Sequence, residues 1–105
     1  MNTPTDRMQC GIEIPKDHPS YAGHFPDHPV LPGAVLLDET LRAIERARGI
    51  DLTLWRIASA KFPHAVRPGD ALRLEHAAAQ GGPIRFTVYS DDRIVVTGTL
   101  SSAAE

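Results

Sequence analysis

The segment HFPDHPVLPGAVLLDET, residues 24–40, holds the side chains of this chain that are best suited to move protons. It begins with His24 and ends near an acid pair, Asp38 and Glu39. A neutral imidazole accepts a proton near pH 7 and a carboxylic acid donates one, so the combination suits general acid–base catalysis. Without such a role, His24 would be polar loop filler and Asp38 a helix-surface charge paired with Arg42.

Histidines are also common metal ligands, and His18, His24 and His28 lie on one loop. Neither carboxylate of the acid pair stands at a diagnostic ligand spacing from them, so we predict no metal site. His64 and His76 lie in or beside strand patterns and are interpreted as packing or surface residues. A structural role, in the core or as a small buried hydrophobe, is also predicted for Trp55, Phe62 and Cys10.

A helix and several strands must position these side chains. Residues 33–48 predict the helix, because Pro32 suits its first turn and Gly49 its C-cap. Its first turns, GAVLL, are apolar all round, which predicts that this end is surrounded by other structure. A long proline-rich loop, residues 15–32, precedes it, and loops of that length are often functional. Hydrophobic residues at period two predict strands over residues 8–14, 54–62, 71–77, 84–90 and 94–100.

Length and composition limit the classes of protein to consider. The 105 residues suit a single domain, 1–105, whose ends 1–6 and 101–105 we expect to be frayed. The formal charge of −2 and the absence of a basic run disfavour nucleic-acid binding. A single cysteine provides no disulfide framework, and no apolar run is long enough to span a membrane. We therefore expect a soluble cytoplasmic protein.

One helix covering one antiparallel sheet predicts an α+β fold, and a sheet wrapped around a central helix is the hot-dog architecture. The stretch GHFPDHPVLPGAVLLD, residues 23–38, resembles the β-hydroxyacyl-acyl-carrier-protein dehydratases of fatty acid synthesis, including variants with aspartate on the helix. FPHAVRPGD, residues 62–70, resembles the downstream strand and turn of that family. The short chain and Asp27-His28 after the HFP motif are more similar to the short dehydratases of aryl-polyene-type biosynthetic clusters.

The resemblance implies dehydration of a (3R)-hydroxyacyl thioester to a trans-2-enoyl thioester. His24 would remove the C2 proton, and the Gly33 N–H would stabilise negative charge on the thioester oxygen. Asp38 would protonate the departing hydroxyl, with Glu39 as the fallback acid. Because aspartic acid has an ordinary pKa of ~3.9, this role requires an apolar pocket or a bound water. Arg42 stands where the family usually has glutamine, and an ion pair with Asp38 would weaken the acid.

The resemblance also implies the assembly and the substrate carrier. Two chains would pair edge to edge as a homodimer, with the loop histidine of one facing the helix acid of the other. A higher assembly of dimers and a heterodimer with a homologue remain open. The acyl group would arrive on the phosphopantetheine arm of an acyl carrier protein, so no separate cofactor is expected. Substrate-binding residues would be Phe25, Pro32, Ala34 and Leu37.

Two other functions stay open at this point. Hot-dog proteins include acyl-thioesterases, which use an acid and water rather than a histidine facing an acid, and the HFPDHPVLPG loop argues against them. A non-catalytic subunit that binds an acyl carrier protein is the second alternative, because the chain is small and carries Arg42 beside Asp38.

Overall fold

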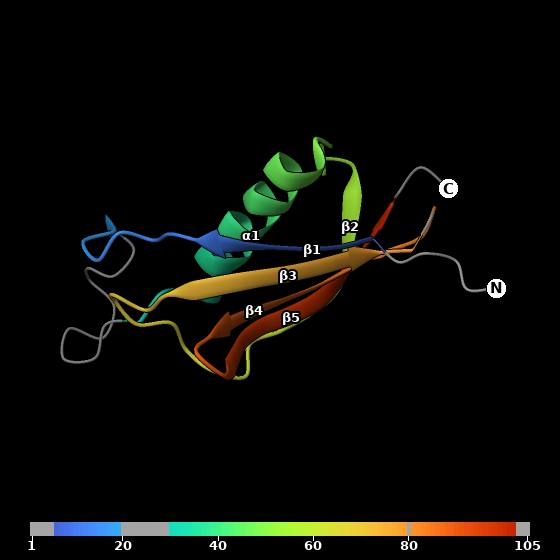
Figure 1. Cartoon of the computed structure of the whole chain (residues 1–105). Coiled ribbons are helices and arrows are strands. Elements are labelled where there is room, and N and C mark those ends of the chain that lie inside the picture. Colours follow the sequence, from blue (N-terminus) through green and yellow to red (C-terminus); the bar gives the residue numbers. More distant parts are fainter. Residues whose placement is uncertain (1–5, 20–29, 80, 103–105) are drawn as a thin grey trace.

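The protein is one helix packed on one face of a five-stranded antiparallel sheet (Figure 1). The computed structural model describes residues 6–19, 30–79 and 81–102. The strand order is β1-β3-β4-β5-β2, which confirms the predicted hot-dog architecture. The elements are β1 (Asp6–Ile12), α1 (Gly33–Arg48), β2 (Trp55–Lys61), β3 (Leu72–Ala78), β4 (Ile84–Ser90) and β5 (Arg93–Ser102).

Local signals determine both ends of α1. The carbonyl oxygen of Pro32 accepts hydrogen bonds from the N–H groups of Val35 and Leu36, at 3.0 and 3.1 Å. At the other end Gly49 adopts the left-handed conformation, with φ of 65°, and donates its N–H to the Glu45 carbonyl oxygen at 2.8 Å. A glycine suits this position because it has no side chain to oppose a positive φ. The predicted bounds of the helix are therefore confirmed.

Only one side of α1 is buried against the sheet. The buried helix residues are Leu36, Thr40, Ala43 and Ile44. Ala34 is exposed, so the expectation that the first turns are surrounded on all sides is wrong for the single chain. Thr40 fits the apolar face because its hydroxyl donates to the Leu36 carbonyl oxygen at 2.8 Å, which satisfies the only polar group of its side chain.

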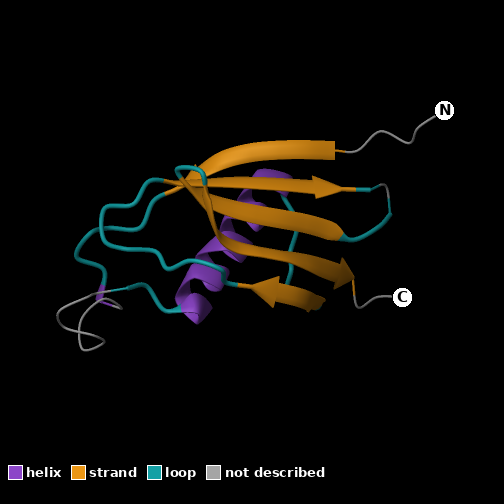
Figure 2. Cartoon of the chain, turned by 90° about the horizontal axis from the view of Figure 1, so that it is seen from below, coloured by secondary structure: helices purple, strands orange, loops and turns teal. Residues whose placement is uncertain are grey.

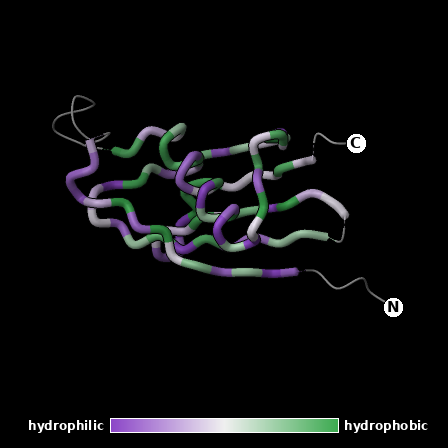
Figure 3. The backbone as a smooth tube through the Cα atoms, turned by 90° about the horizontal axis from the view of Figure 1, so that it is seen from above, coloured by the Kyte–Doolittle hydropathy of each residue, from purple (hydrophilic) through white to green (hydrophobic). Residues whose placement is uncertain are grey.

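The core lies between α1 and the middle of the sheet. Alternate residues of β3 and β4 are buried, as the period-two pattern predicts, and they pack against the buried helix face. Figure 2 shows the helix crossing the strands obliquely, and in Figure 3 the most hydrophobic parts of the strands gather where it crosses them. This packing gives the helix one buried side and leaves its opposite side to solvent.

The strands extend further toward the two termini than the sequence predicts. Asp6 already pairs with Ala78 in β1, and Ser102 pairs with Trp55 at the end of β5. Parts of both segments that we expected to be frayed therefore belong to the sheet, because ladder pairing with a neighbouring strand orders a terminus. The bounds of β4 match the prediction, and the other strand ends differ from it by one or two residues.

The edge strand β2 carries little buried surface. Five of its seven residues are exposed, including Ile57, and exposed Leu54 and Phe62 lie just before and after it. Its register with β5 shifts between Ile57 and Ser59, which marks a bulge. An edge strand of this kind has unpaired backbone groups on its outer side.

Candidate functional site

The structure describes only some of the predicted site residues. His24 and Phe25 lie outside the described residues, so their predicted roles stay predictions. Gly33 is the first residue of α1, and Asp38 and Glu39 follow in the second turn. The described part of the site therefore lies at the start of the helix.

A hollow of about 240 Å³ opens beside Gly33. The N–H of Leu31 donates to the carbonyl oxygen of Val66 at 2.8 Å, which holds the residues after β2 against the start of α1. The exposed side of the hollow is formed by the segment that follows β2, and its base is apolar and buried. The residues that line it are Leu31, Gly33, Leu36, Phe62, Pro63, His64, Ala65 and Val66.

Gly33 has a steric reason to be glycine. A Cβ atom at this position would lie 3.1 to 3.3 Å from three ring carbons of Phe62, which is tighter than ordinary van der Waals contact. The absence of a side chain lets the aromatic ring approach the first turn of the helix. Gly33 and Phe62 both line the hollow.

The backbone of Gly33 also provides a hydrogen-bond donor. It opens α1, so its N–H has no partner within the helix, and no described residue offers an acceptor. No acidic side chain stands in the first turn to compete for it. The partial positive charge of a helix N-terminus adds to the donor. This position can therefore hold a carbonyl oxygen that gains negative charge.

The predicted acid does not reach this hollow in the same chain. The Asp38 side chain is 57% exposed, and its Oδ2 lies 2.9 Å from Nε of Arg42. This carboxylate raises the pKa of Arg42 above its ordinary value, mainly through the hydrogen bond. The ion pair that the sequence suggested is therefore present, and Asp38 does not line the hollow at Gly33. Glu39 is half-buried but does not line the hollow either.

The predicted substrate-binding residues on α1 and before it lie near the hollow without lining it. Pro32 is half-buried and caps the helix, Ala34 is exposed and Leu37 is half-buried. Their roles toward an acyl chain remain predictions. An exposed alanine beside a half-buried leucine leaves apolar surface that a second chain or an acyl group could cover.

Sequence reasoning missed two residues that line the hollow. Phe62 was expected in the core, yet it is 43% exposed, because the chain leaves the sheet at this point and turns the ring toward Gly33. His64 was interpreted as a packing or surface residue, and it is exposed with Nδ1 3.0 Å from the carbonyl oxygen of Ile94. The one available signal was their place in the FPHAVRPGD stretch that resembles the dehydratase family.

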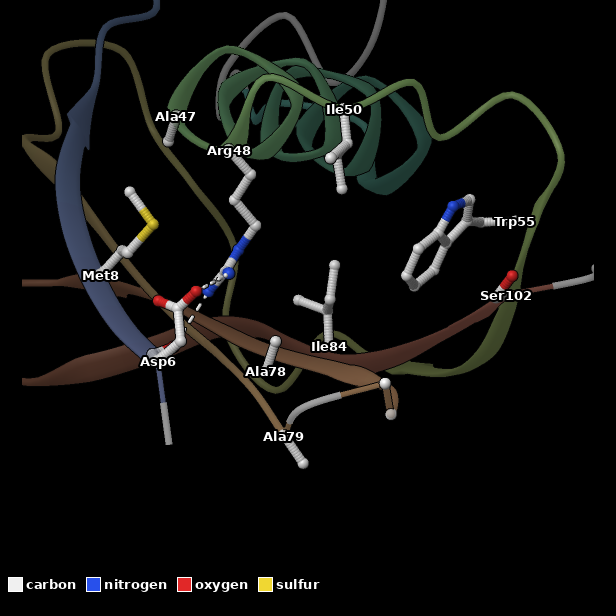
Figure 4. Close-up of a pocket in the computed structure, with 12 residues that line it drawn as sticks. Asp6, Met8, Ala47, Arg48, Ile50, Trp55, Ala78, Ala79, Ile84 and Ser102 are labelled. Carbon is white, nitrogen blue, oxygen red and sulfur yellow. Dashed lines mark hydrogen bonds and ion pairs between the residues drawn. The ribbon is translucent and has the colours of Figure 1, made fainter. Parts of the chain in front are cut away.

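A second, larger cavity of about 630 Å³ opens at the other end of α1 (Figure 4). Arg48 reaches from the helix to Asp6 of β1, with Nη1 2.7 Å from Oδ2, while Ile50, Trp55 and Ile84 form apolar walls. None of the predicted site residues lines this cavity.

Arg48 also contacts a buried histidine. Its Nε donates to Nδ1 of His76 on β3 at 2.8 Å, and the histidine is only 2% exposed. Burial and the nearby Arg48 charge hold the pKa of His76 below its ordinary value of 6.5, with a smaller opposing effect from Asp6. His76 therefore joins the helix end to the sheet as a neutral residue, consistent with the packing role predicted for it.

The part of the chain that the structure describes contains neither a cluster of metal ligands nor a helix that could span a membrane. No three His, Cys, Asp or Glu side chains come together there as metal ligands, although His24 and His28 lie outside that part. In the same part, no helix has the length and apolar character needed to cross a membrane.

Comparisons with known proteins agree with this architecture. A dehydratase named FabZ from Chlamydia trachomatis, a 3-hydroxyacyl-[acyl-carrier-protein] dehydratase, is 32% identical over 96% of this chain and 73% of its own length. The solved dehydratase heterocomplex ApeI:P from Xenorhabdus doucetiae has a TM-score of 0.68 at 20% identity, covering 95% of this chain and 88% of that one. The fluoroacetyl-CoA thioesterase FlK shares the fold, with a TM-score of 0.67 at 14% identity, over 95% and 84% of the two chains.

A family model also matches most of the chain. The model of the ApeI-like family, described as ApeI dehydratase, matches residues 1–99. It includes the HFPDHPVLPG loop, α1 and the hollow at Gly33. The chain belongs to the ApeI-like dehydratase family of hot-dog proteins.

Proposed function

We propose that this protein dehydrates (3R)-hydroxyacyl thioesters carried on the phosphopantetheine arm of an acyl carrier protein. The product is a trans-2-enoyl thioester, made in the cytoplasm for fatty acid or aryl-polyene and polyketide-type biosynthesis. The observation that supports it best is the N–H of Gly33, which has no acceptor among the described residues and belongs to a residue that lines a hollow at the start of α1, in a chain of a dehydratase family. No separate cofactor is needed for this elimination.

The proposed mechanism divides the proton transfers between two side chains. Neutral His24 removes a proton from C2, and the electron pair of that C–H bond moves toward the thioester carbonyl. The Gly33 N–H stabilises the negative charge that develops on the oxygen. The C2–C3 double bond forms as the C3–O bond breaks, and Asp38 protonates the hydroxyl, which leaves as water. The proton held by His24 then returns to the carboxylate through solvent.

The proposed active unit is a homodimer that pairs two β2 edges. The support lies in the exposed apolar residues on and beside this edge, Leu54, Ile57 and Phe62. Pairing there would bring a second chain close to Phe62 and so to the Gly33 hollow. It would also allow Asp38 of one chain to serve a hollow of the other. Because ApeI:P is a heterocomplex, a heterodimer with a homologue is the alternative assembly.

The decisive experiment is a turnover assay with a panel of 3-hydroxyacyl chains on an acyl carrier protein. Formation of the conjugated enoyl thioester is expected, without release of free thiol. Release of free thiol without enoyl product would instead identify a thioesterase. If neither product forms and the protein still binds the carrier, it is a non-catalytic subunit. The panel also determines the preferred acyl chain.

A further inference from the structure

We propose that His64 binds the carrier arm by accepting a hydrogen bond from the amide N–H nearest the thioester. The inference rests on the proposed function and adds a specificity residue to its site. His64 lines the same hollow as Gly33, where the thioester oxygen would be held. It is the only histidine among the described residues that lines this hollow.

The hydrogen bond to β5 determines which ring nitrogen of His64 can accept. The Ile94 carbonyl oxygen has no proton to donate, so Nδ1 of His64, at 3.0 Å, must carry the hydrogen. Neutral His64 therefore has its lone pair on Nε2, which has no partner among the described residues. The same argument gives His76 the opposite tautomer, because its Nδ1 accepts a hydrogen from Nε of Arg48.

The position of His64 within the hollow favours the carrier arm over the acyl group. Leu31, Leu36 and Val66 are buried and form the base, whereas His64 is exposed at the rim. The arm is attached to a carrier protein that cannot enter the hollow, so it must leave across the rim. Only two methylene groups separate the thioester sulfur from the first amide of the arm, which places that N–H close to the oxygen held by Gly33.

The segment that carries His64 is held in place from two directions. Its ring is bonded to β5, and Val66, two residues later, accepts a hydrogen bond from Leu31 beside the helix start. The N–H of Arg67 also donates to the Asp70 carboxylate at 2.9 Å. An acceptor that is fixed before binding loses little freedom when the ligand arrives.

A pair of small thioesters tests this contact without turnover. The first probe is the butyryl thioester of N-acetylcysteamine, which has the amide N–H but no 3-hydroxyl and so cannot be dehydrated. The second replaces that N–H by an ester oxygen. The wild-type protein should bind the amide probe about 3- to 10-fold more tightly, as expected for one net hydrogen bond, in a titration followed by NMR.

Variants of His64 separate its acceptor role from a structural one. His64→Leu should weaken binding of the amide probe by about the same factor, leave the ester probe unchanged, and so remove the difference between the probes. His64→Gln should retain most of the difference, because its amide oxygen can take the place of Nε2. The control is Arg85→Leu, at an exposed position of β4 that does not line the hollow.

The outcomes distinguish this inference from the proposed function. Equal binding of both probes by the wild-type protein, or an unchanged preference in His64→Leu, would overturn the role of His64. Failure of the wild-type protein to dehydrate any 3-hydroxyacyl chain, with the probe preference intact, would overturn the proposed reaction and keep the binding contact. Spectra of each variant without probe show whether the fold is retained.

Discussion

Gly33, at the start of α1, matters both for its backbone N–H and for the packing of its neighbours. Because it opens the helix, its N–H has no acceptor among the described residues, and the lack of a Cβ admits the Phe62 ring. A donor of this kind needs a proton acceptor and a proton donor to complete the elimination. His24 and Asp38 are the residues proposed for those two steps, and each can be tested separately.

Loss of the base should nearly abolish the reaction. His24→Ala should lower kcat/KM for dehydration by at least ~100-fold, the low end for removal of a positioned general base. Its thermal unfolding should match that of the wild type. Dehydration close to the wild-type rate would show that another group removes the C2 proton.

The two carboxylates should differ in their effect. Asp38→Asn should strongly reduce dehydration while Glu39→Gln retains most activity, because the family motif aligns with Asp38. Neither change should alter folding much, since the Asp38–Arg42 pair is solvent-exposed. Rates and unfolding curves of the two variants check this together. The opposite order of activities would assign the acid role to Glu39.

At the scale of the elements, the bulge in β2 lies close to Gly98 of β5, where a larger side chain would not fit. A Cβ at Gly98 would lie 2.3 Å from the Ser59 carbonyl oxygen and 2.7 Å from the Phe86 ring. Ser59 belongs to the strand where the register shifts, so the bulge brings its carbonyl toward β5. The edge strand that borders the proposed dimer interface therefore depends on this close approach.

Adding a methyl group at this position should destabilise the sheet. Gly98→Ala should lower the free energy of unfolding by about 1–3 kcal/mol, because a backbone carbonyl and a buried ring must both move. Gly11→Ala is the control, since its Cβ would meet only the Leu72 carbonyl oxygen at 3.7 Å. Denaturant unfolding of both variants measures the difference. A Gly98 variant as stable as the control would mean that β2 moves freely relative to β5.

The hydrogen bond between Arg48 of α1 and buried His76 of β3 makes the stability of the fold sensitive to pH. Because the pKa of His76 is lowered in the folded protein, the unfolded chain takes up the proton first as the pH falls below about 6.5. This linkage should leave stability level above that pH and lower it progressively as the pH falls below it. Thermal unfolding over this range should show a smaller slope for His76→Gln. An equal slope in that variant would assign the pH dependence to other groups.

At the scale of the whole molecule, the single chain keeps Asp38 away from the Gly33 hollow, although the proposed reaction uses both. The Gly33 hollow and the exposed Asp38 lie on the same helix, but Asp38 pairs with Arg42 rather than facing the hollow. An edge-to-edge dimer would supply the acid from the second chain. Each active site would then contain parts of both chains.

Mixed dimers test such a composite site. His24→Ala and Asp38→Asn homodimers should each be nearly inactive, yet co-expression should restore activity, because one site of the mixed dimer has both intact residues. Random pairing makes half of the dimers mixed, so recovery of about a quarter of wild-type activity is the upper limit. Mixed dimers are verified with two different affinity tags. If they stay as inactive as their parents, both groups act within one chain.

The helix, the strands and the family can all be predicted from the sequence alone. The bounds of α1 follow from Pro32 and Gly49, and the strands follow from alternating hydrophobic residues. These signals are local, because a cap or a period depends on residues a few positions apart. The GHFPDHPVLPGAVLLD stretch likewise identifies the family without any knowledge of the fold.

Which side chains contact one another could not be predicted without the tertiary structure. It buried Thr40, left Asp38 in solvent, and placed Phe62 and His64 beside Gly33 through the hydrogen bond between Leu31 and Val66. Helix periodicity places Asp38 at the border of the apolar face and cannot say whether another element covers that border. These contacts join segments that are far apart in the chain, so they depend on how the sheet curves and on which strand is left at its edge.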